Sequence, residues 1–177
     1  MRDFELKFSG LSIGKHQFDY ELNKTFFDFF QNNGVEDELI QNGSLVFNVD
    51  LDKKDNLLVF DIDFNGTVDV SCDVCLDDLE LTITGESRIL GKYGEEDEWQ
   101  EEDVLVIPSK DHKIDLKNLF YELIHLSLPA KLVHEEGKCD PVMLKKLEEY
   151  NNNGDVDSTE ETDPRWNALK DLFKDKN

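Results

Sequence analysis

The chain has 177 residues, and 41 acidic against 19 basic side chains give a formal net charge of −22. No apolar run approaches the roughly 20 residues that a membrane span needs. Direct binding to nucleic-acid phosphates requires clustered Lys and Arg, which the large excess of acidic residues disfavours. The first residues show no secretion signal, and three cysteines cannot all pair in disulfides. We therefore expect a cytoplasmic protein with no membrane partner, whose charge attracts basic partners.

The first half of the chain shows the period of β-strands. Apolar and polar residues alternate over residues 4–8, 18–22, 44–51, 58–70 and 79–83. Gly66 predicts a β-bulge. Residues 25–31 predict a short Phe-rich helix with Asn23 or Thr25 as its cap, and a strand is the alternative there because Phe suits both states. Consecutive strands joined by short turns predict an antiparallel β-meander, either a curved sheet or a partly closed barrel.

The second half changes in composition. Residues 95–103 read EEDEWQEED and predict an exposed acidic loop around Trp99, and residues 104–107 predict a return to the sheet. The helical period over residues 115–128 predicts the main helix, packed on the sheet and ended by Pro129, and residues 141–150 predict a shorter one. We expect an α+β domain over residues 1–150. Residues 151–177 follow as a flexible acidic linker and a short C-terminal helix.

The sharpest local motif is the pair Cys72 and Cys75 in the sequence CDVC. Two cysteines at this spacing can bind one metal ion from a tight turn. The third cysteine, Cys139, follows His134 by five residues, so that these four side chains would form a tetrahedral Cys3His set. A structural zinc ion held there would tie the segment after the main helix to the sheet. Against this, Leu76 stands where such turns often carry a glycine.

Two other interpretations of the cysteines stay open, namely buried or idle thiols and a redox pair. A redox pair of the thioredoxin type stands where a strand meets a helix, whereas strand-like alternation follows this one, which disfavours redox work. The sequence has no nucleophile elbow, phosphate-binding loop or dinucleotide fingerprint. Carboxylates are too abundant for an acid and base pair to stand out. We therefore expect no catalytic residues, no enzymatic activity and no small-molecule substrate.

Several short motifs follow one another from the middle of the chain to its end. They are GTV at residues 66–68, CDVCL at 72–76, IDL at 114–116, the stretch from Glu122 to Pro129, Cys139, and DPRWNAL at 163–169. In this order and spacing they resemble the YceD family of large ribosomal RNA subunit accumulation proteins. Many relatives look richer in cysteine where this chain has residues 131–140, with one Cys and His134.

The resemblance implies a non-enzymatic role in accumulation of large-subunit ribosomal RNA (rRNA), and hence in ribosome biogenesis. For so acidic a chain we expect an indirect route, in which it binds a basic ribosomal or ribosome-assembly protein. The candidate contacts are Trp99 and the C-terminal stripe of Trp166, Leu169 and Phe173, although the stripe can instead dock on the protein's own core. Two alternatives stay open, a zinc-stapled structural or interaction module and direct rRNA binding through Lys131, Lys138, Lys145 and Lys146.

Overall fold

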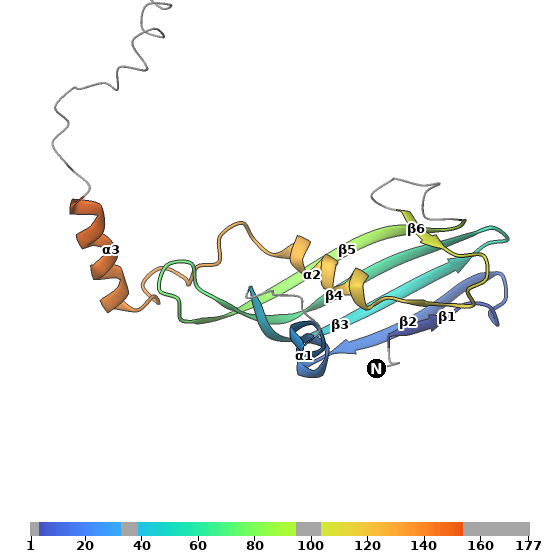
Figure 1. Cartoon of the computed structure of the whole chain (residues 1–177), viewed down its shortest axis with the longest axis horizontal. Helices are drawn as coiled ribbons and strands as arrows, with labels where there is room; N and C mark the ends of the chain where they lie inside the picture. The colour runs from blue at the N-terminus through green and yellow to red at the C-terminus, as the bar shows by residue number, and fades with distance from the viewer. Residues whose placement is uncertain (1–3, 33–38, 95–103, 154–177) are drawn as a thin grey trace, which may run out of the picture.

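The computed structural model describes residues 4–32, 39–94 and 104–153 (Figure 1). The strands within these ranges are β1 (Glu5–Lys7), β2 (Gly14–Leu22), β3 (Ile40–Lys53), β4 (Leu57–Ser71), β5 (Asp78–Tyr93), β6 (Val104–Ile107) and β7 (Lys113–Asp115). The helices are α1 (Lys24–Asn32), α2 (Lys117–Ser127) and α3 (Pro141–Asn153). The predicted contacts Trp99, Trp166, Leu169 and Phe173 lie outside the described residues, as does most of the predicted C-terminal linker and helix.

Five strands form the main sheet, in the order β2-β3-β4-β5-β6. From β2 to β5 each strand pairs antiparallel with the next, as a meander does. The short strand β6 pairs parallel with the end of β5, so the sheet as a whole is mixed rather than purely antiparallel. A separate antiparallel pair joins β1 to β7. The described strands therefore form an open sheet and a small ribbon, and they close no barrel.

Gly66 lies where β4 passes close to β3. Its φ is +154°, and a Cβ atom added there would lie 2.2 Å from the carbonyl oxygen of Ser44. Only glycine fits such an approach without moving the neighbouring backbone. The predicted bulge at Gly66 is wrong, because its pairing with both neighbouring strands stays in register. The register shift in β3 lies instead between Ile40 and Asn42.

One face of the main sheet carries an aromatic core, which α1, α2 and the β1 segment cover (Figure 1). Phe47 of β3 stacks on Phe64 of β4 with ring centroids 4.5 Å apart, and it lies 4.4 Å from the Phe120 ring of α2. Phe26 of α1 meets Phe4 at 5.2 Å. Among the described residues no polar or charged one is buried. The predicted packing of the main helix on the sheet is thus confirmed.

Short polar side chains mark where the three helices begin. In each case a side-chain oxygen accepts a hydrogen bond of 3.0 Å from the backbone N–H two residues later, and the acceptors are Asn23, Asp115 and Asp140. Such bonds satisfy N–H groups that have no partner within the helix. All three helices fall within a few residues of their predicted bounds. Within the described ranges, no helix has the length and apolar character needed to cross a bilayer.

The opposite face of the main sheet is acidic and faces solvent. Carboxylates far outnumber basic groups among the side chains that point away from the core there. They belong to Asp19, Glu21, Asp50, Asp52, Asp61, Asp63, Asp69, Glu80 and Glu86. We call this surface the acidic sheet face. Arg88 on the same face binds Asp61 through two hydrogen bonds of 2.6 and 3.0 Å.

Candidate metal centre

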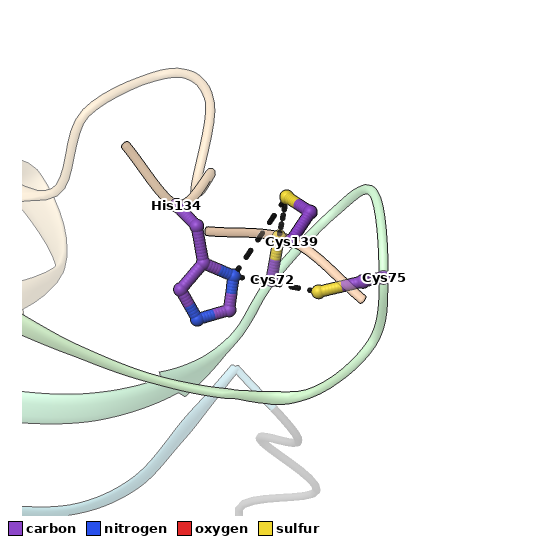
Figure 2. Close-up of side chains that lie close together, drawn as sticks. All are labelled: Cys72, Cys75, His134 and Cys139. Atoms are coloured by element: carbon purple, nitrogen blue, oxygen red, sulfur yellow. Dashed lines mark hydrogen bonds between the residues drawn. The ribbon is translucent and has the colours of Figure 1, made fainter. Parts of the chain in front are cut away.

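Cys72, Cys75, His134 and Cys139 come together, and Figure 2 shows their side chains pointing toward one another. Their ligand atoms all lie within 4.8 Å of one another. The sulfurs of Cys72 and Cys139 are 3.9 Å apart, and His134 Nδ1 lies 3.4 Å from Cys75 Sγ and 3.9 Å from Cys139 Sγ. With Zn–S bonds of about 2.3 Å, tetrahedral geometry sets two sulfurs about 3.8 Å apart. The spacing therefore suits a tetrahedral zinc ion.

The four side chains come from two distant parts of the sequence. Cys72 directly follows β4, and Cys75 lies in the turn that leads to β5, where both side chains are buried. His134 and Cys139 come from the segment between α2 and α3 and are half-buried. The folded chain thus joins the β4–β5 turn to the inter-helix segment through these side chains, as the sequence predicts for a site tying that segment to the sheet.

The turn that carries the cysteines has the backbone shape expected of a glycine-containing one. The carbonyl of Cys72 accepts a hydrogen bond from the N–H of Leu76 (2.9 Å), and the N–H of Cys72 donates to the carbonyl of Asp77 (2.9 Å). Leu76 adopts a φ of +64°, in the left-handed region, and its side chain is 67% exposed. A non-glycine residue held in this conformation costs roughly 1–2 kcal/mol. The turn therefore forms without a glycine, at the cost of a strained backbone conformation at Leu76.

The surroundings of the thiols favour one anionic sulfur. Burial acts to raise the pKa of the Cys72 thiol, but backbone N–H groups of Cys75, Val74 and His134 outweigh it and lower that pKa to about 6. Burial raises the pKa of Cys139 to about 11, and the neighbouring Cys72 and Cys75 sulfurs add to the shift. Ionising Cys139 in addition to Cys72 is thus costly in the protein alone. A bound divalent cation would offset the charge of Cys139 and displace its proton.

A second contact fixes the ring of His134. Its Nε2 atom lies 3.2 Å from the backbone carbonyl oxygen of Asp78. Because a carbonyl can only accept, Nε2 carries the hydrogen and Nδ1 presents its lone pair to the cysteine sulfurs. Ligating histidines commonly donate their other ring N–H to such an acceptor. His134 is therefore already in the tautomer that a metal ligand requires.

Asp73 links the same two segments through hydrogen bonds, and the sequence alone does not single it out. Its backbone N–H donates to the carbonyl of Leu132 at 2.7 Å, while its Oδ2 accepts from the N–H of Leu132 at 2.7 Å. These two bonds set the position of the segment that carries His134. Only its place inside the CDVC motif distinguishes Asp73 from the many other acids of the chain.

The basic residues considered for direct rRNA binding lie next to this centre but alternate with acids. Lys138 forms an ion pair with Glu135 at 2.7 Å. In α3, Lys145 and Lys146 are separated from Glu148 and Glu149 only by Leu147. Phosphate binding requires basic groups that are not offset by neighbouring carboxylates. This surface is accordingly a poor match for an RNA backbone.

The matches to known proteins point to one family. The model of the family described as large ribosomal RNA subunit accumulation protein YceD matches residues 60–173, nearly two thirds of the chain. The matched region contains both halves of the candidate metal centre. Comparison with curated proteins and with solved structures gave no match. The family description names rRNA accumulation and no reaction. This chain belongs to the YceD family.

Proposed function

We propose that this protein supports accumulation of large-subunit rRNA in the cytoplasm without catalysing a reaction, by binding a basic ribosomal or ribosome-assembly protein on the acidic sheet face. Its family supplies the link to rRNA accumulation. The observation that carries the binding mode is the arrangement of charge on that face. The protein would keep its basic partner bound until rRNA, a stronger polyanion, competes for the partner and binds it instead.

Carboxylates oppose one another across neighbouring strands of the acidic sheet face. Asp63 of β4 lies opposite Glu86 of β5, and Asp69 lies opposite Glu80. Like charges in directly opposed positions destabilise a sheet. Arg88 offsets negative charge around Asp61, to which it binds, and Lys54 forms an ion pair with Asp52. A basic partner would relieve the rest, and the field of the whole chain would speed its arrival.

The test is a comparison of two variants that each remove two acids. Asp63→Asn/Glu86→Gln neutralises an opposed pair on the acidic sheet face, and Glu148→Gln/Glu149→Gln makes the same charge change on α3. Tagged proteins are captured from cells at low and moderate salt, and bound proteins and RNA are identified. We expect basic large-subunit or assembly proteins with the unmodified chain and the α3 variant, released by added salt, and several-fold less with the sheet variant.

Two results would contradict the proposal. One is the recovery of no ribosomal or assembly protein at low salt. The other is RNA that stays bound when no protein partner is present and is unaffected by the sheet variant. That second result would favour direct binding through the basic residues near the metal centre. Steady-state large-subunit rRNA, measured in cells that carry each variant, links binding to the role of the family.

The Cys3His geometry favours a second function, and we propose that a structural zinc ion binds Cys72, Cys75, His134 and Cys139. Four ligands close the coordination sphere and leave no position for a substrate, which suits a structural role rather than a catalytic one. The reducing cytoplasm would keep the three thiols free for the metal.

Metal content and the absorption of the cobalt-substituted protein test this site. The purified chain should hold a single zinc ion, and cobalt should give the intense visible bands of a tetrahedral thiolate site. His134→Asn should weaken binding strongly, whereas His16→Asn, a histidine in β2, should not. Cobalt bands typical of six oxygen or nitrogen ligands, or equal metal content in both variants, would contradict the assignment.

A further inference from the structure

α3 carries an apolar stripe that the described part of the chain leaves open to solvent. Leu147 is 41% exposed and Tyr150 is 77% exposed, and Leu144 one turn earlier is also exposed. The helix projects beyond the end of the main sheet (Figure 1), and only Met143 packs partly against the core. A helix of 13 residues is marginal on its own in water, because its first turn is costly to form. Contact along this stripe would stabilise it.

A groove of about 680 Å³ continues the stripe toward the metal centre. Val74 from the β4–β5 turn, Val133 and Cys139 from the inter-helix segment, and Leu144 from α3 line it. Leu144 belongs to both surfaces, so the groove and the exposed stripe of α3 form one continuous surface. It is apolar along Val74, Val133 and Leu144, and the charged Lys131, Glu135 and Glu136 also line the groove. We call it the α3 surface. Its size suits a few large apolar side chains rather than a single small one.

The sequence after α3 offers side chains of this kind. Trp166, Leu169, Leu172 and Phe173 recur at the spacing of one helix face. Residues 154–165 separate α3 from Trp166, and 12 residues span at most about 40 Å when extended. Residues 166–173 therefore cannot move far from the α3 surface. A tether this short gives them an effective concentration at that surface on the order of millimolar. A separate partner would have to outcompete this local concentration.

We infer that the apolar stripe of residues 166–173 docks in cis on the α3 surface of the same chain. Docking buries a Trp and a Phe, which are large apolar side chains, against Leu144, Leu147 and Tyr150. It also covers the side of the metal centre on which Cys139 lies. The stripe of residues 166–173 then covers α3. The acidic sheet face is left open for a basic protein to bind. This inference rests neither on the proposed partner nor on bound zinc.

The fluorescence of Trp166 tests the inference in the full chain. Trp99→Phe leaves Trp166 as the only tryptophan. In cis docking, its emission lies to the blue of the unfolded chain, and acrylamide quenches it several-fold less. Leu147→Glu should restore strong quenching, because it places a charge in the apolar contact. Lys146→Glu adds the same side chain at the adjacent position off the stripe and should leave the protection unchanged. Far-UV circular dichroism checks that both variants keep the sheet.

Each other outcome overturns the inference. If acrylamide quenches Trp166 equally in the folded and in the unfolded chain, the stripe of residues 166–173 is not docked. Protection that disappears on dilution shows docking between two copies of the chain. Protection that survives Leu147→Glu places the stripe elsewhere on the molecule. Protection that appears only when a basic protein is added makes the stripe a partner contact.

Discussion

The main sheet and the candidate metal centre are held together by different kinds of interaction. In the main sheet, aromatic side chains from β2, β3, β4, α1 and α2 fill a core in which no described polar residue is buried. At the centre, two buried and two half-buried candidate ligands and the two Asp73–Leu132 hydrogen bonds join the turn to the inter-helix segment. The first kind of interaction is spread over many contacts, while the second depends on a few atoms. Damage to the sheet should therefore be global, and damage to the centre should be local.

The largest effect should come from removing a ring of the core. Phe120 of α2 is fully buried and contacts rings from β2 and β3. We expect Phe120→Ala to lower the free energy of unfolding by about 3–5 kcal/mol, because the lost ring leaves a cavity. Leu126→Ala on the same helix removes a side chain that is 75% exposed and should change it by less than about 0.5 kcal/mol. Urea unfolding measures both. Equal effects would mean that α2 does not pack as the structure shows.

Removal of the proposed zinc ion should have a smaller effect on the whole molecule and a strong effect on one segment. Without the ion, Cys139 regains its proton, and the inter-helix segment is held by hydrogen bonds such as those of Asp73 with Leu132 and of His134 with Asp78, together with the packing of Leu132. We expect faster amide exchange over residues 130–140 on chelation, and little change in β3 and β4, where the aromatic core protects the backbone. Hydrogen exchange followed by mass spectrometry gives both values in one experiment. Exchange that rises equally in the sheet would show that the two regions unfold as one unit.

The contrast between the two regions also explains what the sequence could predict. Alternation in residues 44–51 and 58–70 reports which side chains face a core, so the strands and the aromatic face could be predicted. Alternation carries no information on strand direction, and the parallel pairing of β6 could not be predicted from residues 104–107. Gly66 was misread as a bulge because a glycine in a strand marks either a bulge or a close backbone approach.

The candidate metal centre could be predicted from the sequence for a different reason. Cys and His are rare in this chain, so Cys72, Cys75, His134 and Cys139 could be grouped before their positions were known. Asp73 could not be singled out in the same way, because carboxylates are common throughout. The conformation of Leu76 was also hidden, since leucine rarely adopts a positive φ.

A modest gain in stability is expected at that leucine. Leu76→Gly removes the cost of the left-handed conformation and loses little burial, because the side chain is mostly exposed. Glycine also makes the unfolded chain more flexible, which offsets part of the gain. We expect a net stabilisation of about 0.5–1 kcal/mol in thermal unfolding of the zinc-loaded protein. Leu76→Ala keeps the strained conformation and should give no gain. Destabilisation by glycine would show that the leucine side chain makes a needed contact.

The smallest effect concerns the acidic sheet face, where two neighbouring aspartates should respond in opposite directions. The side-chain hydrogen bond from Arg88 is the main cause that lowers the pKa of Asp61 in the folded protein. A lowered folded-state pKa adds stability that is present above the pKa of the unfolded chain and is lost as pH falls through the folded value. Asp61→Asn should therefore slightly reduce stability at neutral pH and flatten its decline in acid.

Asp63→Asn removes a carboxylate opposite Glu86 and should slightly raise stability at neutral pH. Urea titrations between pH 3 and pH 7, at low salt, distinguish the two signs. The same sign in both variants would mean that cross-strand repulsion on this face is already screened, and a basic partner would then gain nothing from relieving it.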